Sequence, residues 1–270
     1  MGALDGKVVV VTGSTRGIGR AIAEACAAAG AAVVVSSRTS LAVEETVAAF
    51  AARDWRVAGV TCDVRKAEDV ERLLNESIDI FGGLDVWVNN AGIPQGMIPL
   101  DEMTEDEANE IIEVNVIGTL NGCRAVLPYL KKNGGVLINI TGKGGDGKAS
   151  AYMSVYAASK AAISGLTKSL AAENKDYPVS IHLLSPGMVP TDFYKDLRVG
   201  KNLESKAAGV PYVLEAIGVP LEEAGRLAAR IAAQKPGEKT GLTYNAFSGG
   251  RKARGLLRLI KMRLSGKIQA

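Results

Sequence analysis

The chain has 270 residues, of which 47% are hydrophobic and 23% are charged, a balance typical of a globular protein and unlike that of a disordered chain. A net charge of +3 is too small to indicate a nucleic-acid partner. No run of 18 apolar residues is long enough to span a membrane as a helix.

The cysteines and the single histidine are predicted to be structural. Cys26, Cys62 and Cys123 lack metal-ligand spacing and cannot all pair, so we expect free thiols in a reducing compartment and no metal site. His182 lies inside an apolar run and is expected in the core. Because the chain enters a strand almost at once without signal-peptide features, we predict a cytoplasmic protein.

Short apolar runs alternate along the chain with longer alanine-rich segments of helical character. The apolar runs lie at residues 7–12, 32–36, 56–61, 84–88, 135–141, 179–184 and 241–247. The helical segments lie at 18–29, 40–53, 66–80, 104–131 and 152–175, with a capping box at Thr104 and Glu107. Runs without polar alternation suit strands that are buried on both faces. The pattern predicts a single-domain α/β fold over residues 1–250, a Rossmann-type doubly wound parallel sheet of about seven strands, and a basic C-terminal helical extension over 251–270.

A glycine-rich turn, TGSTRGIG, follows the first predicted strand and opens the first predicted helix. Gly13, Gly17 and Gly19 let the backbone turn tightly and approach a pyrophosphate, whose charge is favoured by the helix N-terminus. Glycine turns are common, but a strand before and a helix after are the context of a dinucleotide site. The loop therefore predicts a nucleotide cofactor.

The end of the second predicted strand favours NADP(H) over NAD(H). An NAD site usually has Asp or Glu there, whereas this chain has Ser36, Ser37 and Arg38. Together with Arg16 of the glycine turn, Arg38 suits a 2′-phosphate, which guanidinium groups bind bidentately. The alternative, that Arg38 is a solvated loop residue, remains open.

Tyr156 and Lys160 form the candidate acid/base pair. They are four residues apart in a predicted helix and so share one face. An ammonium next to a tyrosine favours the phenolate and lowers the tyrosine pKa toward the useful range. We expect Tyr156 to transfer the proton and Lys160 to activate it while also holding the cofactor ribose.

These motifs, in this order, resemble the classical short-chain dehydrogenase/reductase family over essentially residues 5–250. NNAG at 89–92 and Asn115 in EVNVIG match further family motifs, and Asn115 is the implied anchor of the proton relay. The resemblance implies an oxidoreductase acting on carbonyl or alcohol groups, and a homo-oligomer (dimer or tetramer). The implied cofactor-binding residues are Gly13, Ser14, Thr15, Arg16, Gly17, Ile18, Gly19, Arg38, Asp63, Val64, Asn90, Ala91, Gly92, Tyr156, Lys160, Pro186, Gly187, Val189 and Thr191.

The family's usual catalytic serine is not found. Anchoring INIT on the fifth strand places that position at Gly142, whereas counting back 13 residues from Tyr156 gives Lys143. Thr141 is one residue early, and strand alternation points it to the other face. Loss of one donor to a developing oxyanion costs about 10²–10³ in rate, so a protein with little turnover stays an alternative.

The same region, with SIHLLSPGMVPTDFY after it, resembles more loosely the chlorophyll b reductase branch of the family. That branch has a glycine-rich loop in place of the serine, and it reduces a formyl group on a porphyrin-like ring. The segment 192–218, with Tyr194, Leu197, Val199 and three glycines, lies where the family keeps its substrate lid. The resemblance implies a hydrophobic carbonyl or alcohol substrate.

The tail after Gly250 is basic. Residues 251–267 contain seven Lys and Arg residues and no acid. On a helical wheel Leu257, Ile260 and Leu264 share one face with Ala253 and Leu256, while Leu259 and Met262 lie outside it. Packing on another subunit, peripheral contact with an anionic membrane and covering of the active site all remain open.

The leading function is an NADPH-dependent carbonyl reductase, and two other classes of function remain as alternatives. A cofactor-binding sensor or scaffold would need the glycine turn but no acid/base pair, so Tyr156, Lys160 and Asn115 favour the enzyme. A membrane-surface adaptor built on the same fold depends on the tail alone.

Overall fold

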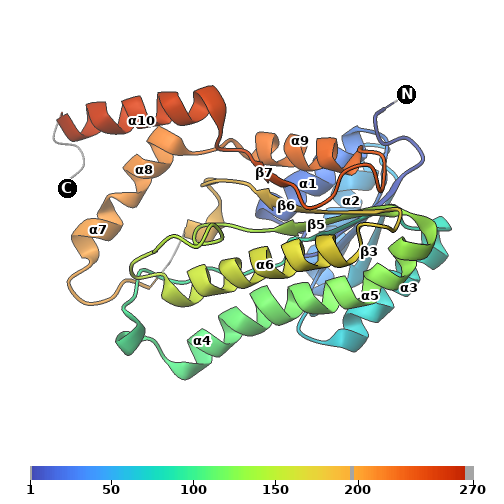
Figure 1. The fold of residues 1–270 in the computed structure, drawn as a ribbon, viewed down its shortest axis with the longest axis horizontal. Coiled ribbons are helices and arrows are strands. Elements are labelled where there is room, and N and C mark those ends of the chain that lie inside the picture. The colour runs from blue at the N-terminus through green and yellow to red at the C-terminus, as the bar shows by residue number, and fades with distance from the viewer. Residues whose placement is uncertain (1, 195–197, 265–270) are drawn as a thin grey trace.

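The computed structural model of the chain describes residues 2–194 and 198–264 and centres on one seven-stranded parallel sheet (Figure 1). The strands are β1 (Val8–Val11), β2 (Ala32–Ser37), β3 (Val57–Thr61), β4 (Val86–Asn89), β5 (Gly135–Ile140), β6 (Val179–Ser185) and β7 (Thr243–Asn245). They are arranged in the order β3-β2-β1-β4-β5-β6-β7. Strands β2 and β3 are added on one side of β1, and β4 to β7 are added on its other side, so the strand order switches between β1 and β4. In parallel sheets of this kind, ligands bind beyond the carboxyl ends of the strands at the switch point. The predicted fold class is confirmed.

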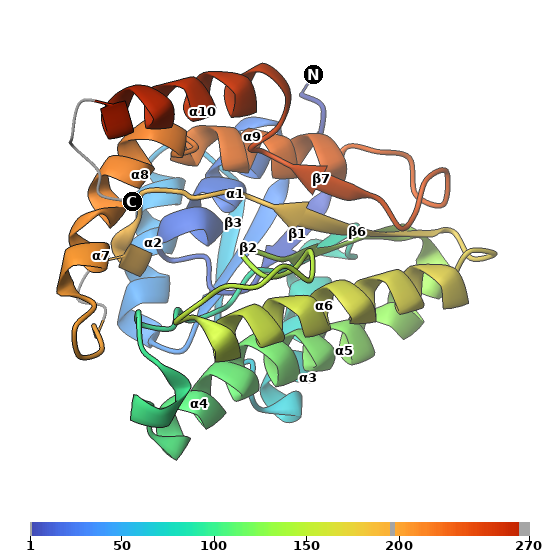
Figure 2. The same ribbon diagram turned by 60° about the vertical axis from the view of Figure 1, so that its left-hand side comes forward.

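Helices cover both faces of the sheet (Figure 2). They are α1 (Gly17–Ala28), α2 (Ser40–Ala51), α3 (Ala67–Phe81), α4 (Glu105–Ile112), α5 (Gly118–Asn133), α6 (Ser154–Glu173), α7 (Glu204–Ala208), α8 (Val210–Ile217), α9 (Leu221–Ala232) and α10 (Gly249–Leu264). Short turns of helix are η1 (Leu100–Glu102), η2 (Glu113–Ile117) and η3 (Asp192–Tyr194). Within the described part of the chain, none of these helices is long and apolar enough to cross a bilayer.

Alternate residues of each central strand serve two separate cores. In β1, Val9 and Val11 pack on the side of α1, α2 and α9, whereas Val8 and Val10 pack on the side of α3, α5 and α6. All four valines are buried. Because successive side chains of a strand point to opposite faces, an apolar run without alternation is what a sheet covered on both sides requires.

The helix predicted over 104–131 is divided in the structure. The capping box at its start is confirmed, since Thr104 accepts from the Glu107 N–H at 3.2 Å and Glu107 accepts from the Thr104 N–H at 2.8 Å. The α-helix then gives way to the π turn η2 before α5 begins. A π turn inserts one extra residue and is common at functional sites.

Helices α7, α8 and α9 were not among the predicted elements. The segment of α9 repeats Leu221, Ala224, Ala228 and Ile231 at helical spacing, and the last three are buried. α9 packs closely on α1, where a Cβ at Gly225 would meet the Ala21 carbonyl. The helical spacing of these four residues was the sequence signal that could have predicted α9. Small residues at the contact let α1 and α9 approach closely.

The cysteines and His182 are buried side chains. Cys26, Cys62 and Cys123 are free, and burial raises the pKa of each thiol to about 12. His182 lies edge-on to Tyr244 with ring centroids 5.4 Å apart, and burial lowers its pKa to about 4. In the described residues no group of His, Cys, Asp or Glu side chains is arranged to hold a metal ion.

Candidate active site

The glycine turn between β1 and α1 lies against the loop that follows β4. Gly13 has φ +63°, and a Cβ there would lie 2.9 Å from the Ala91 Cα atom. Gly17 has φ +57° and begins α1, whose first N–H groups have no partner within the helix. A Cβ at Gly19 would meet the Asn90 side chain and the Gly13 carbonyl oxygen. The turn therefore depends on glycine for both its conformation and its close packing.

Thr12 and Asn90 hold the two sides of the crevice together. The Thr12 hydroxyl oxygen accepts from the N–H groups of Asn90 at 3.0 Å and Ala91 at 3.1 Å. The Asn90 amide donates to the carbonyl oxygens of Thr12 at 2.9 Å and Gly13 at 3.1 Å. The sequence analysis missed Thr12, and its place directly before Gly13 was the only signal for it.

Ser14, predicted to bind cofactor, uses its side chain to hold the backbone. Its hydroxyl donates to the Val11 carbonyl at 2.6 Å and accepts from the Ser36 N–H at 2.9 Å. These bonds tie the glycine turn to the end of β2. Thr15 and Arg16 follow, and Arg16 is exposed.

The charged residues near the ends of β2 and β3 form a second cluster. Arg38 is half-exposed, and its guanidinium lies 3.9 Å from the Glu110 carboxylate. Asp63 accepts from the Arg65 Nε atom at 3.0 Å, and this bond is the main cause that lowers the Asp63 pKa. Val64 is buried, and its carbonyl accepts from Asn121 at 2.9 Å.

Asn115 lies in the π turn η2 and connects the β4 loop with α6. Its side chain accepts from the Ile93 N–H at 2.8 Å and donates to the Ile93 carbonyl at 3.1 Å. It also donates to the Ser159 hydroxyl at 3.1 Å, and that hydroxyl donates to the Tyr156 carbonyl at 2.7 Å. Asn115 thus fixes the first turns of α6 relative to Gly92, at which a Cβ would lie 3.1 Å from its Oδ1 atom.

Tyr156 and Lys160 are both buried in α6, with the Lys160 Nζ atom 5.5 Å from the centre of the Tyr156 ring. The ammonium donates to the Ile140 carbonyl of β5 at 3.4 Å. The Tyr156 N–H donates to the buried Gln95 side chain at 2.9 Å. Gln95, which the sequence analysis missed, also donates to the Tyr152 carbonyl at 3.3 Å and so holds the start of α6.

Burial dominates the pKa values of this pair. It raises the pKa of Tyr156, with a smaller contribution from the neighbouring Tyr194, and lowers the pKa of Lys160 to about 8. The expected lowering of the Tyr156 pKa by the ammonium is not found, because desolvation of the phenolate is the larger effect. Burial thus favours the neutral phenol of Tyr156 and weakens the preference of Lys160 for its charged form.

Gly142 faces the Tyr156 hydroxyl. A Cβ at Gly142 would lie 2.8 Å from the Tyr156 Oη atom and 3.6 Å from the Lys160 Cγ atom. Thr141 points into α6 instead, with its Oγ1 atom 3.0 Å from the Ser164 hydroxyl, and Lys143 is exposed. The residue beside the phenol is therefore a glycine, and the phenol lies too close to leave room for a Cβ at this position.

The segment after β6 returns to the glycine turn. Gly187 has φ +77°, and Val189 is buried in a small cluster with Ile18 packed against it. A Cβ at Gly17 would lie 3.8 Å from the Thr191 Cγ2 atom. The structure thus places residues 186–191 next to the glycine turn, which itself packs on the NNAG loop.

The segment expected to form the lid is bonded to α4 and to the loop after β4. Arg198 donates to both carboxylate oxygens of Glu107, at 2.9 and 2.8 Å, and Gly200 donates to the Met97 carbonyl at 2.8 Å. A cavity of about 110 Å³ lies between Arg198 and residues 93–111. Leu197, expected in the lid, falls outside the described residues.

The sequence matches a family model described as short chain dehydrogenase over residues 7–202. It is 35% identical over 217 residues to the "Probable chlorophyll(ide) b reductase" of Arabidopsis thaliana chloroplasts, covering 73% of this chain and 43% of that protein. It is 38% identical over 198 residues to the "Dehydrogenase/reductase SDR family member 4" of Sus scrofa, covering 73% of this chain and 71% of that protein. The chain therefore spans less than half the length of the first of these relatives.

Two solved structures with bound cofactors share the fold. The 3-ketoacyl-(acyl-carrier-protein) reductase of Brucella melitensis, complexed with NADH, superposes with a TM-score of 0.79 at 25% identity, covering 92% of this chain and 99% of that one. A variant of actinorhodin polyketide ketoreductase with NADPH gives a TM-score of 0.78 at 27% identity, covering 91% and 97%. The crevice described above thus belongs to a fold in which both dinucleotides are bound.

Proposed function

This chain belongs to the short-chain dehydrogenase/reductase family, whose members act on alcohol and carbonyl groups with NAD(P), and from that we propose that it reduces the carbonyl group of a hydrophobic substrate with NADPH. The observation that carries the proposal is the buried pair Tyr156 and Lys160, one helical turn apart, with a glycine next to the Tyr156 hydroxyl. A buried ammonium and a buried phenol are costly to desolvate, and acid/base chemistry is a use that requires both.

The chain fits the cofactor by its backbone. At Gly13 and Gly19 a Cβ would collide with the NNAG loop or with the turn itself, so the glycines let the two loops pack together at the carboxyl ends of the strands. The N-terminus of α1 offers unpaired N–H groups to a pyrophosphate. Arg16 and Arg38 are exposed enough to reach a 2′-phosphate, and no carboxylate follows β2 directly. These features support NADP(H).

The residues of this chain supply the proton and hold the site. When bound, reduced nicotinamide supplies the hydride for the carbonyl carbon. Tyr156 donates its phenolic proton to the carbonyl oxygen, and its raised pKa keeps that proton in place at neutral pH until reduction occurs. Lys160 then stabilises the phenolate by its charge, since an opposite charge nearby favours the ionised form. Asn115 anchors the proton relay and positions α6 through Ser159.

The substrate class follows from Gly142 and from the relatives. The glycine next to the Tyr156 hydroxyl adds no side chain at the phenol, and one relative is named for chlorophyll(ide) b, a large apolar molecule. We therefore place a large apolar aldehyde or ketone first among the candidates. Gly142 also supports the second candidate function, a cofactor-binding sensor or scaffold with little turnover, because it provides no side-chain donor for the oxyanion.

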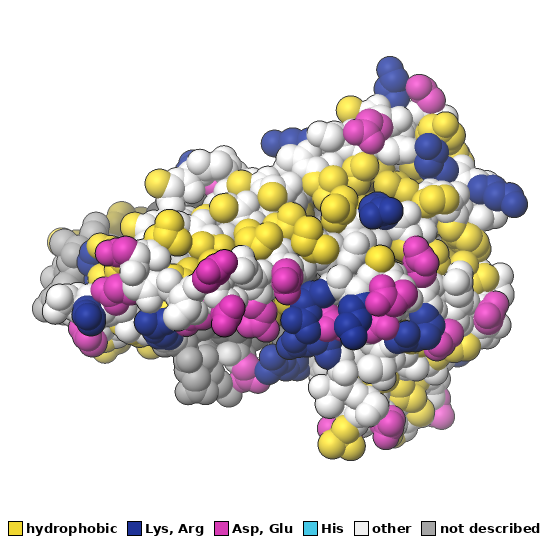
Figure 3. All heavy atoms as spheres, turned by 90° about the horizontal axis from the view of Figure 1, so that it is seen from below, with side chains coloured by type: hydrophobic (Ala, Val, Ile, Leu, Met, Phe, Trp, Pro, Cys, Tyr) yellow, Lys and Arg dark blue, Asp and Glu magenta, His cyan; other side chains and the backbone are white. Residues whose placement is uncertain are grey.

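A homo-oligomer, dimer or tetramer, is the proposed assembly. Hydrophobic side chains gather on the face that Figure 3 shows. A hollow of about 490 Å³ on α5 and α6 is lined by Leu127, Pro128 and Leu170 together with Arg124, Lys131, Glu173 and Asn174. A hollow with both apolar and charged residues on a helical face suits a second subunit. A cytoplasmic location stays a prediction.

The decisive experiment follows NADPH oxidation with a panel of aldehydes and ketones that includes bulky formyl aromatics. Tyr156→Phe should keep NADPH affinity and lose reduction, because the ring remains and the proton donor is gone. Lys160→Met should impair both, since the ammonium serves the tyrosine and the ribose. Full activity in Tyr156→Phe would refute the mechanism, and wild-type binding of NADPH without turnover on any substrate would favour the sensor.

A further inference from the structure

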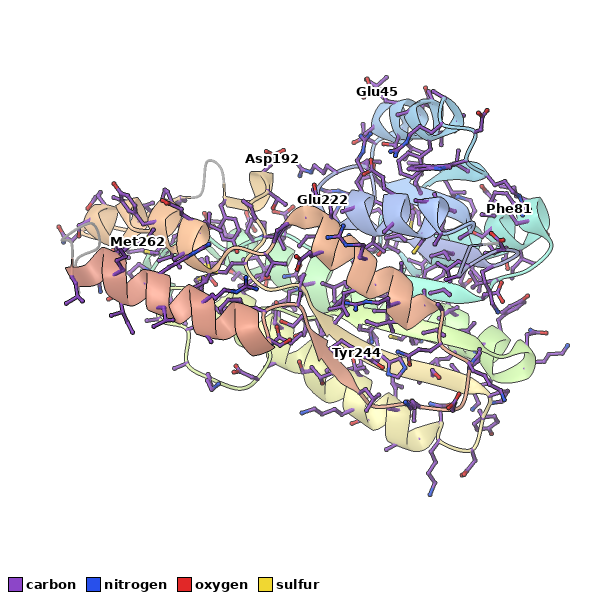
Figure 4. The ribbon with its side chains drawn as sticks, turned by 90° about the horizontal axis from the view of Figure 1, so that it is seen from above. Glu45, Phe81, Asp192, Glu222, Tyr244 and Met262 are labelled. Carbon is purple, nitrogen blue, oxygen red and sulfur yellow. The ribbon has the colours of Figure 1, made fainter. Side chains whose placement is uncertain are left out.

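Helix α10 has one face packed on the protein and another face exposed. Gly255 is buried, and a Cβ there would lie 2.9 Å from Ile217 of α8 and 3.2 Å from the Phe247 ring. Leu259 and Met262, one and two turns further along the same side, are half-buried. Figure 1 draws α10 alongside α8 at the outer edge of the molecule, and Figure 4 shows Met262 near the end of α10.

The exposed face of α10 carries large apolar side chains. Leu257, Ile260 and Leu264 are spaced three and four residues apart and are 66%, 55% and 85% exposed. The helical wheel places them on one face, and the structure turns that face away from the protein because Gly255, on the opposite side of the helix, occupies the contact with α8. The two residues that the wheel separated from the apolar face, Leu259 and Met262, are the ones that pack inward.

Cations flank this exposed apolar face. Arg254, Arg258 and Lys261 are spaced four and three residues apart, so they share one side of the helix, adjacent to the apolar face. The sequence from residue 249 to residue 270 contains no Asp or Glu to neutralise them. An apolar stripe bordered by Lys and Arg is the pattern of a helix that lies in the interface of an anionic bilayer.

We propose that α10 binds an anionic lipid surface, inserting Leu257, Ile260 and Leu264 among the acyl chains while Arg254, Arg258 and Lys261 contact lipid headgroups. A second copy of the chain fits this face less well, because a twofold contact between two α10 helices would bring the same unneutralised cations together. Covering of the active site by this face is excluded by its orientation, since α10 meets α8 through its other side. The side of the molecule on which α10 lies outside α8 then faces the bilayer.

The test is flotation with vesicles of 70% phosphatidylcholine and 30% phosphatidylserine. At low salt the full chain should float with these vesicles and not with pure phosphatidylcholine, and high salt should release it, because screening weakens the headgroup contacts. The triple variant Leu257→Gln, Ile260→Gln, Leu264→Gln should reduce binding at least tenfold. Replacing Arg254, Arg258 and Lys261 by Gln should reduce binding and remove its salt dependence.

Matched controls separate lipid binding from other effects. Leu41→Gln changes an equally exposed leucine on α2 and should float like the wild type. The triple apolar variant should keep its melting temperature and its mass in solution, since the three side chains touch little of the protein. Flotation that survives this variant would overturn the proposal, as would a variant that floats normally but has a lower oligomer mass. Tyr156→Phe should float normally, so failure of the proposed enzymatic function would leave this result unchanged.

Discussion

At the scale of single residues, Arg38 is expected to select the cofactor. NADPH should bind at least tenfold more tightly than NADH, a difference of about 1.4 kcal/mol that one charge-assisted contact can supply. Arg38→Asp should reverse the order, whereas Glu110→Gln, which removes the carboxylate 3.9 Å from that guanidinium, should keep it. Fluorescence titration of both cofactors is the measurement, and equal affinities in the wild type would count against NADP(H).

Gly142 permits a second test at this scale. Because a Cβ at this position would lie 2.8 Å from the Tyr156 Oη atom, Gly142→Ala must displace the phenol and should lower kcat on bulky carbonyls by about 10²-fold. NADPH affinity should not change. Gly142→Ser should lose as much on bulky substrates but exceed the alanine variant on small ketones, since its hydroxyl can donate to the oxyanion. Unchanged kcat in the alanine variant would mean that the phenol has room to move.

The sequence predicted which residues form the site better than it predicted their pKa values. Spacing alone placed Tyr156 and Lys160 on one face of a helix, and strand alternation pointed Thr141 away, as the structure has it. The directions in which the Tyr156 and Lys160 pKa values shift depended on burial, which a local sequence pattern does not reveal. Gln95 lies 61 residues from the backbone N–H that it accepts from, so only the folded chain reveals its role.

At the scale of elements, periodicity predicted whether a segment is helix or strand and was less informative about how a helix ends or faces. The segment 104–131 has helical character throughout, yet the structure inserts the π turn η2, in which Asn115 reaches Ile93 and Ser159. The apolar wheel face of α10 was identified from sequence, but whether it points inward depends on the close contact at Gly255. Both features result from packing against distant segments.

At the scale of the whole molecule, His182 gives global stability a defined pH dependence. Burial lowers its pKa to about 4, below the ordinary 6.5, so the unfolded state binds a proton more readily than the native state between these values. The contribution of His182 to the free energy of unfolding is therefore constant above pH 6.5. It falls by up to about 1.4 kcal/mol per pH unit as the pH drops from 6.5 toward 4.

Denaturant unfolding at several pH values measures this effect. His182→Phe keeps a ring against Tyr244 and cannot titrate, so the difference between wild type and variant isolates the histidine from the carboxylates. The wild type should lose stability relative to the variant as the pH falls from 6.5 to 4. Parallel stability curves would show that the buried imidazole does not resist protonation.

The sequence by itself determined the α/β class, the parallel sheet, the glycine turn and the tyrosine–lysine pair, because each is encoded in spacing over a few residues or in continuous apolar runs. Tertiary structure decided between Gly142 and Lys143 as the residue facing the Tyr156 hydroxyl, and it added Thr12 and Gln95 to Asn115 among the residues that hold the site. It also decided that α10 turns Leu257, Ile260 and Leu264 outward. These depend on contacts between segments far apart in the chain, where desolvation and close packing act and local patterns carry no information.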